Sequence, residues 1–272
     1  MKNILVPTDF SEVSDNAADY AAELAKITNA KLIFYYVFTV PVPVADAPVI
    51  AIPVEDLEKE SMKLLHALDK KVKARHGKIE TELRAQPGFV VDEIISFTKE
   101  HKIDLVVMGV TGSGKTPGLL GSNATSVMHH AQSPVLVIPK NYKFKKPEAI
   151  ALACDYKSIL PDDAVDKFKS FVALFNSKVL VFNVLKPKEL ASYEKAATEV
   201  NLENALDDIE HSLYFPASEN LHHEINSFVD KHNAEILVMF PHNYSFLKGI
   251  IHHSATKEMA FLTHVPLLSI HE

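Results

Sequence analysis

The sequence is poor in cysteine and has no long hydrophobic run. Its one cysteine, Cys154, has no second cysteine with which to form a disulfide inside the chain, and it lies in the apolar run AIALAC. We expect a buried thiol, because free cysteine in such surroundings behaves as a small hydrophobic residue. No stretch of about 20 apolar residues occurs, which argues against a membrane-spanning helix. The opening MKNILVPTDF becomes polar too early for a signal peptide, so we expect a soluble, cytoplasmic protein.

Positive charge is in deficit, because the formal net charge is -7 at pH 7 and the isoelectric point is near 6.1. A protein that binds the phosphate backbone of nucleic acid needs a basic face, so this charge argues against a nucleic-acid partner. The sequence also shows no acid–base pair, nucleophile elbow or metal hydrolase centre. Glycine is scarce and unevenly placed, since five of the eight glycines fall between Gly109 and Gly121.

The chain contains two copies of one pattern. KNILVPTDFSE at 2–12 matches EAIALACDYKS at 148–158, AKLIFYYVF at 30–38 matches SKVLVFNVL at 177–185, and HKIDLVVMG at 101–109 matches HNAEILVMF at 232–240. The order of the matches is the same in both copies, which indicates tandem domains. We expect the domains to span residues 1–142 and 147–272, with the polar segment NYKFKKP connecting them.

Each copy alternates short apolar runs with longer amphipathic ones, which is typical of an α/β fold with a parallel sheet. We predict two Rossmann-like domains, each a five-stranded parallel sheet flanked by helices. In the first copy the predicted strands are 2–7, 31–38, 79–85, 104–109 and 135–139, and the predicted helices are the run capped by Ser11, 55–77, 90–102 and 122–131. Right-handed crossovers then bring the carboxyl ends of the first and fourth strands to one edge, where Asp9 would face the glycine-rich loop.

The stretch GVTGSGKT at 109–116 fits the phosphate-loop template and follows the apolar run IDLVVM. A phosphate loop leads directly into a helix, whereas Lys115 and Thr116 are followed by Pro117 and Gly118. The helix is better started at Ser122, and no later strand ends in an acidic residue suited to Mg²⁺. We therefore favour another interpretation, in which the glycines turn the chain off the strand and a helix amino terminus at 121–122 holds the phosphates.

This pattern, together with ILVPTDFSE near the start and SPVLVIP at the end of the first copy, resembles the universal stress protein family. The tandem arrangement resembles its two-domain members, which implies domains of the adenine nucleotide alpha hydrolase-like type. In the ATP-binding branch of that family the signature is G-x-x-G, nine residues and G-[ST]. Here only eight residues, from Ser113 to Leu120, separate the two parts.

The resemblance implies an ATP site, with Mg²⁺ as an optional companion. The implied contacts are Pro7, Thr8 and Asp9 at the adenine and ribose, Val37 at the adenine edge, Met108 and Gly109 under the nucleoside, Gly112 beside the α- or β-phosphate, and Gly121, Ser122 and Asn123 at the phosphate tail. Lys115 is not fixed by the family pattern, but its ammonium group can reach the γ-phosphate. The alternative is that Asp9 only caps the following helix and the glycines only turn a loop.

The second copy lacks the glycines of the first and contains only Gly249. The counterparts of Gly109, Gly112 and Gly121 are Phe240, Asn243 and His253. Side chains at these positions would block close approach of a ligand to the backbone, so we predict one nucleotide site per chain, in the first copy. Nine of the fourteen histidines lie in the second copy, but their spacing is not that of zinc ligands, and we assign no metal site.

The function that the resemblance implies is that of an ATP-binding regulatory or sensor protein of the stress response, with weak or no hydrolysis. Two alternatives stay open, namely a slow Mg²⁺-dependent ATPase that uses Lys115 and Thr116, and a nucleotide-independent interaction or chaperone-like protein. The sequence does not identify a protein partner. The apolar segments VLVIP at 135–139 and VPLLSI at 265–270 are expected to pair between the domains as an intramolecular pseudo-dimer. A homodimer of chains is a further possibility.

Overall fold

The structure is a computed structural model that describes residues 1–40, 53–110, 122–154, 162–187, 205–240 and 264–271. The elements of its first half are β1 (Asn3–Pro7), α1 (Glu12–Thr28), β2 (Lys31–Phe38), α2 (Val54–His76), β3 (Thr81–Pro87), α3 (Val90–Glu100), β4 (Leu105–Val110), α4 (Ser122–His130) and β5 (Val135–Pro139). Those of its second half are β6 (Ala149–Ala153), α5 (Asp162–Ala173), β7 (Lys178–Phe182), β8 (His211–Tyr214), α8 (Leu221–His232), β9 (Ile236–Met239) and β10 (Leu267–Ser269).

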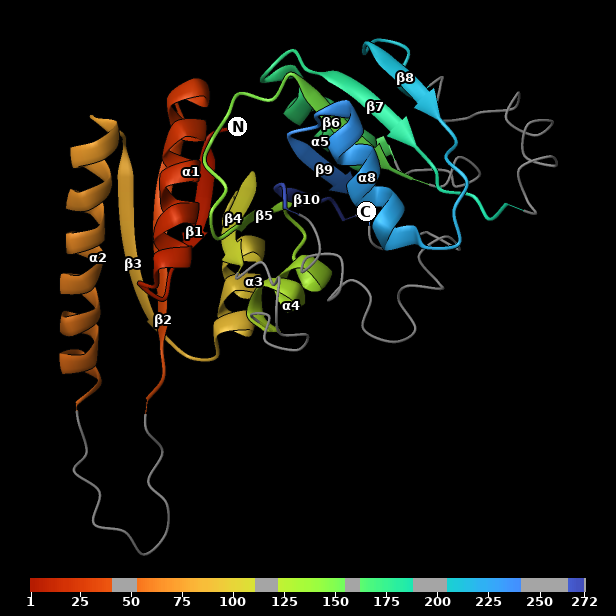
Figure 1. The fold of residues 1–272 in the computed structure, drawn as a ribbon. Helices are drawn as coiled ribbons and strands as arrows, with labels where there is room; N and C mark the ends of the chain where they lie inside the picture. Colours follow the sequence, from red (N-terminus) through yellow and green to blue (C-terminus); the bar gives the residue numbers. More distant parts are fainter. Residues whose placement is uncertain (41–52, 111–121, 155–161, 188–204, 241–263, 272) are drawn as a thin grey trace, which may run out of the picture.

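These strands form a single sheet of ten strands in the order β3-β2-β1-β4-β5-β10-β9-β6-β7-β8 (Figure 1). Each half contributes five strands that pair in parallel. The halves meet where β5 and β10 pair antiparallel, with Leu268 opposite Leu136. The structure thus confirms the predicted α/β fold class and the predicted pairing of the two last strands.

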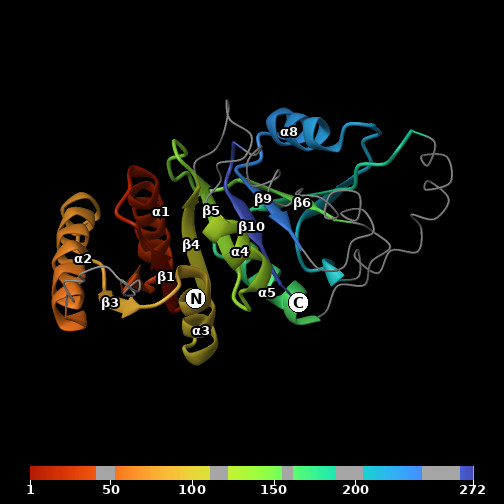
Figure 2. The same ribbon diagram turned by 90° about the horizontal axis from the view of Figure 1, so that it is seen from below.

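Helices cover both faces of each half, as Figure 2 shows for α1 and α3 in the first half and for α5 and α8 in the second. Helix α1 begins where the Ser11 side chain accepts a hydrogen bond from the Ser14 backbone, and it ends at Asn29 in the left-handed conformation. Its small side chains bring it close to the sheet. Five of its side chains that lie along one face are buried, namely those of Ala17, Tyr20, Ala21, Leu24 and Ala25.

Most predicted boundaries hold to within two residues. Strands β2 and β5 have the predicted bounds, and α4 begins at Ser122 as expected. Strand β3 lies two residues later than predicted, because its pairing with β2 continues until Pro87 lies beside Phe38. A proline is tolerated there because β3 is an edge strand, where a missing N–H costs no ladder bond.

The segment between the halves packs against both of them. The Tyr142 hydroxyl donates a hydrogen bond to the Glu235 carbonyl at 3.1 Å, and Asn16 of α1 donates to the Tyr142 carbonyl at 3.0 Å. Phe144 meets the buried ring of Tyr20 edge-on, with 5.0 Å between the ring centroids. This connection is therefore part of the packed structure and does not act as a free tether.

A second contact between the halves lies at the end of α4. The Ser269 hydroxyl donates to the Met128 carbonyl at 3.4 Å, and the buried His271 ring contacts the same oxygen through Nε2. Carbonyls in the last turn of a helix have no partner within the helix, so side chains from the other half satisfy this one.

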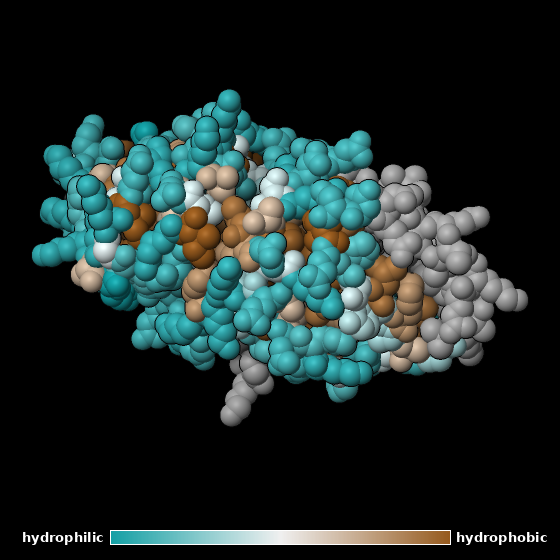
Figure 3. Space-filling model, turned by 90° about the horizontal axis from the view of Figure 1, so that it is seen from above, coloured by the Kyte–Doolittle hydropathy of each residue, from teal (hydrophilic) through white to brown (hydrophobic). Residues whose placement is uncertain are grey.

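On the face that Figure 3 shows, hydrophobic residues gather along the middle between hydrophilic margins. Among the described residues, no helix has both the length and the apolar character needed to cross a bilayer. Cys154 is 1% exposed, as its apolar surroundings predicted.

We predict that Leu268→Ala lowers the free energy of unfolding by about 2–5 kcal/mol, the usual cost of a cavity at a buried leucine. Leu268 is 0% exposed and lies where β10 meets β5. Denaturant unfolding measures the effect, with Leu64→Ala as the control. The Leu64 side chain is 42% exposed, so its loss is expected to change the free energy by less than about 0.5 kcal/mol. If Leu268→Ala lowered the free energy of unfolding no more than Leu64→Ala does, the pairing of β5 with β10 would contribute little to stability.

Candidate functional site

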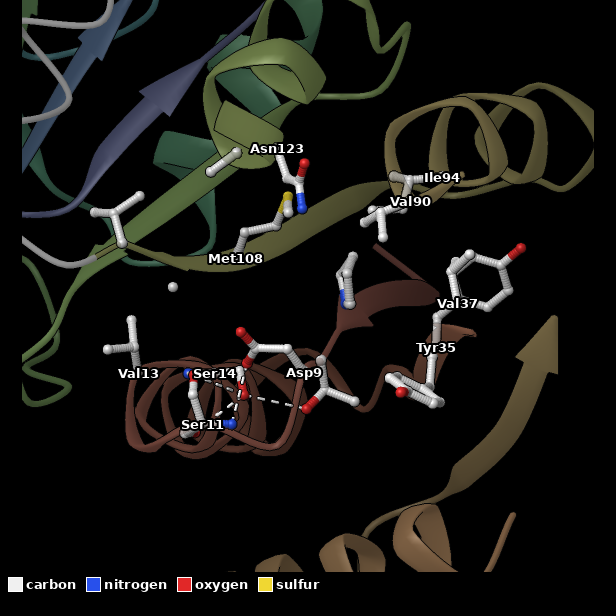
Figure 4. A pocket seen from close by; sticks show the side chains of 16 residues that line it. Asp9, Ser11, Val13, Ser14, Tyr35, Val37, Val90, Ile94, Met108 and Asn123 are labelled. Atoms are coloured by element: carbon white, nitrogen blue, oxygen red, sulfur yellow. Dashed lines mark hydrogen bonds between the residues drawn. The ribbon is translucent and has the colours of Figure 1, made fainter. Parts of the chain in front are cut away.

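A pocket of about 300 Å³ opens at the carboxyl ends of β1, β2 and β4 (Figure 4). It lies where the strand order reverses, because β1 pairs with β2 on one side and with β4 on the other. Ligands of open α/β sheets bind at such reversals. The lining residues are Pro7, Thr8, Asp9, Ser11, Val13, Ser14, Tyr35, Tyr36, Val37, Val90, Ile94, Met108, Gly109, Val110, Asn123 and Ala124.

Seven of the eleven residues predicted from the sequence line this pocket, namely Pro7, Thr8, Asp9, Val37, Met108, Gly109 and Asn123. Ser122 is the first residue of α4. The other three, Gly112, Lys115 and Gly121, lie outside the described residues, as does Thr116 of the phosphate-loop match. The structure therefore brings the predicted residues at the end of β1 into one pocket with those of β4 and the start of α4.

One backbone hydrogen bond and one side-chain hydrogen bond hold the turn after β1. The Thr8 N–H donates to the Tyr35 carbonyl at 3.0 Å, and the Thr8 hydroxyl accepts from the Phe10 N–H at 3.0 Å. Phe10 has a φ of 61°, the left-handed conformation that few residues other than glycine adopt. This bend places the Asp9 side chain at the mouth of the pocket.

Asp9 does not cap α1, because Ser11 does so. The Asp9 carboxylate instead accepts a hydrogen bond from the Ser11 N–H at 3.0 Å. Partial burial raises the pKa of Asp9, but hydrogen bonds from Ser11 and from the Ser14 side chain outweigh it and hold the pKa below its usual range. Asp9 is thus an ionised acceptor at neutral pH.

One wall of the pocket is apolar. Val37 of β2 and Met108 of β4 are only 8% and 7% exposed, and both lie near the carboxyl ends of their strands. Val90 and Ile94, one turn apart on α3, complete this wall, and Figure 4 shows Asp9 across the pocket from Met108. A flat apolar ring can rest on such a wall while a polar group reaches the carboxylate.

Gly109 permits a close approach between β4 and α1. A Cβ atom there would lie 2.7 Å from Cγ1 of Val13 and would also overlap the Val13 backbone. The prediction that Gly109 turns the chain off the strand is wrong, because Gly109 lies within β4 and pairs with Ile138. The residue is needed for packing space and not for a turn.

The two helices that begin beside the pocket differ in charge. The first turn of α3 carries Asp92 and Glu93, whereas the first turn of α4 carries no acidic residue. Free N–H groups and the helix dipole attract anions at an amino terminus, and nearby carboxylates oppose this attraction. The end of the pocket at Asn123 therefore suits an anion better than the end at Val90.

Sequence reasoning missed nine lining residues, which are Ser11, Val13, Ser14, Tyr35, Tyr36, Val90, Ile94, Val110 and Ala124. Two signals could have found some of them. Alternation along β2 places Tyr35 and Val37 on one face of the sheet, and the break at Pro87 and Gly88 places the start of α3 at the same edge.

The counterpart of Gly109 in the second half carries a large, buried side chain. Phe240, the counterpart of Gly109, is 0% exposed and meets Phe168 of α5 edge-on, with 6.2 Å between the ring centroids. Asn243 and His253 lie outside the described residues. In the part of the chain that the structure describes, no three His, Cys, Asp or Glu side chains are grouped so as to hold a metal ion.

The sheet and the position of its pocket define a doubly wound α/β protein. The model of the universal stress protein family matches residues 1–139, and the chain belongs to this family. A universal stress protein of Methanocaldococcus jannaschii is 36% identical over 52% of this chain and 84% of its own length. The crystal structure of a universal stress protein from Archaeoglobus fulgidus covers 99% of this chain and 98% of its own, with a TM-score of 0.75 and 19% identity. This second likeness shows that the fold extends over both halves.

We predict that the pKa of Asp9, followed by NMR titration of its carboxyl carbon, lies below the value of an ordinary aspartate and rises toward that value in Ser11→Ala. A carboxyl group whose pKa is lowered by folding stabilises the fold above its ordinary pKa, and this stabilisation is lost as the pH falls through the lowered pKa. Ser96→Ala is the control, because the Ser96 hydroxyl donates to Glu100 on α3. An unchanged midpoint in Ser11→Ala would contradict the assignment.

Proposed function

We propose that this chain is an ATP-binding universal stress protein with one nucleotide site, located in the pocket at the carboxyl ends of β1 and β4. The observation that carries the proposal is the combination of groups around this pocket. An apolar wall, an ionised carboxylate and a helix amino terminus without acidic residues face one cavity. These three features correspond to the base, the sugar and the phosphates of a nucleotide.

In this proposal the adenine base rests on the apolar wall. Val37 and Met108 present strand ends to the base, and the backbone groups of Val37 can hydrogen-bond to its edge. Pro7 and Thr8 border the base and sugar, and the Asp9 carboxylate accepts hydrogen bonds from the ribose hydroxyl groups. Because Asp9 stays ionised at neutral pH, it is a strong acceptor for such donors.

The phosphates extend toward α4. The charge difference between α3 and α4 supports this orientation, since Asp92 and Glu93 would repel phosphate at the other end. Ser122 and Asn123 then donate to the phosphate tail. The resemblance in the sequence adds Gly112, Gly121 and Lys115 on the same side, and Mg²⁺ can accompany the phosphate oxygens there.

The pocket supports a binding role more than a catalytic one. Asp9 is the one carboxylate among the described lining residues, and a hydrogen-bond acceptor for ribose cannot also activate water at a distant phosphate. We propose that nucleotide binding changes the surface around the glycine-rich loop, and that a protein partner responds to that change. We also propose division of the chain into domains at 1–142 and 147–272, with the second domain unable to bind nucleotide.

We predict that equilibrium dialysis of the purified chain with labelled ATP gives one ATP per chain. Asp9→Asn is expected to lower the affinity about tenfold or more, because a hydrogen bond to a charged acceptor contributes about 1.5–3 kcal/mol. Asparagine retains an oxygen for the Ser11 N–H, so the turn after β1 is preserved.

The control is Asp166→Asn, which changes an exposed carboxylate on α5 in the second half. Its affinity for ATP is expected to equal that of the unaltered chain. Binding of two ATP molecules per chain would contradict the proposal of a single site, and absence of ATP binding would contradict the proposed function altogether.

A further inference from the structure

Phe89 is an exposed aromatic residue beside the pocket. Its exposure is 77%, compared with 39–42% for Val54, Ile27 and Leu64, the other large hydrophobic residues that are exposed in the described part of the chain. An aromatic ring in water loses the free energy that burial would provide. Such a ring gains stability when a ligand or a partner covers it.

The backbone around Phe89 is fixed. The Gly88 N–H donates to the Phe38 carbonyl at 3.0 Å, and the Phe89 carbonyl accepts from the Glu93 N–H at 2.9 Å, in the first turn of α3. Gly88 has a φ of 153°, and a Cβ atom there would lie 2.6 Å from Cγ of Glu93. The turn thus holds the Phe89 backbone in one place, and the freedom of the residue lies in its side chain.

Phe89 adjoins the apolar wall of the pocket. The next residue, Val90, lines the pocket, and consecutive Cα atoms are about 3.8 Å apart. The turn lies next to the end of β2, because Pro87 pairs with Phe38, which follows the lining residue Val37. The end of the pocket that suits a base is therefore the end at which the exposed ring lies.

We propose that Phe89 stacks on the base of the bound nucleotide and so favours ligands with an aromatic base over ligands that offer only sugar and phosphate. This inference rests on the proposed function. The base would lie between the apolar wall and the Phe89 ring, which would bury both of its faces. Aromatic rings bind any nucleobase through the faces of the rings, so Phe89 would strengthen binding without distinguishing adenine from guanine.

The chain contains no tryptophan, so Phe89→Trp places the one tryptophan of the variant at the proposed contact, where its emission can be excited apart from that of tyrosine. We expect its emission to change saturably as ATP is added, with a midpoint equal to the dissociation constant from dialysis of the same variant. Ribose 5-phosphate, which lacks the base, is expected to cause no such change. The matched control is Ile27→Trp in the last turn of α1, a helix about 25 Å long that begins at the pocket, and its emission is expected to stay constant.

Phe89→Ala tests the same contact without a fluorophore. We expect about a tenfold loss of affinity for ATP, as for removal of an aromatic side chain that stacks on a base, and an unchanged melting temperature, because the ring is exposed. Phe89→Leu is expected to restore only part of the affinity.

The outcomes separate the two proposals. If the unaltered chain binds ATP while the fluorescence of Phe89→Trp does not respond and Phe89→Ala binds ATP normally, the stacking role is wrong and the nucleotide site stands. The exposed ring would then be available to a protein partner. If the unaltered chain binds no ATP, the proposed function fails, and the role of Phe89 fails with it.

Discussion

The candidate site depends on the pairing of β1 with two strands at once. Strand β1 pairs in parallel with β2 on one side and with β4 on the other. Helix α1, which follows β1, and helix α3, which precedes β4, lie on opposite faces of the sheet. The strand ends consequently part at this point, and side chains from both faces can reach the opening. Asp9 follows β1, Val37 lies next to the last residue of β2, Met108 lies in β4, and α3 and α4 begin beside them.

The two halves differ in side-chain size at one corresponding position, which is Gly109 in the first half and Phe240 in the second. In the first half, Gly109 and the small residues of α1 let the helix approach β4, and a cavity remains at the strand ends. In the second half, Phe240 is buried and its ring meets that of Phe168 on α5. Since interiors are close-packed, these rings need space between strand and helix that Gly109 does not need in the first half.

Much of the fold could be predicted from the sequence, because the signals were local. Alternating apolar runs gave the strands, Ser11 marked the start of α1, and glycine and proline before Ser122 placed the start of α4. The site was harder, because it is assembled from separate segments. Val90 and Ile94 look like ordinary core residues of an amphipathic helix, and only the packing of α3 on the sheet places them at the pocket. The reason for Gly109 depends on its distance from Val13, which no local pattern contains.

The antiparallel seam between β5 and β10 makes the two repeats mutually dependent. All five residues of β5 are buried, and the carbonyl of Met128 near the end of α4 is satisfied by Ser269 and His271 from the far repeat. A fragment cut after β5 would carry an open strand of apolar residues, the kind of edge at which chains associate and aggregate. The second repeat therefore covers an edge of its neighbour that other chains could otherwise join, and this role does not depend on any ligand of its own.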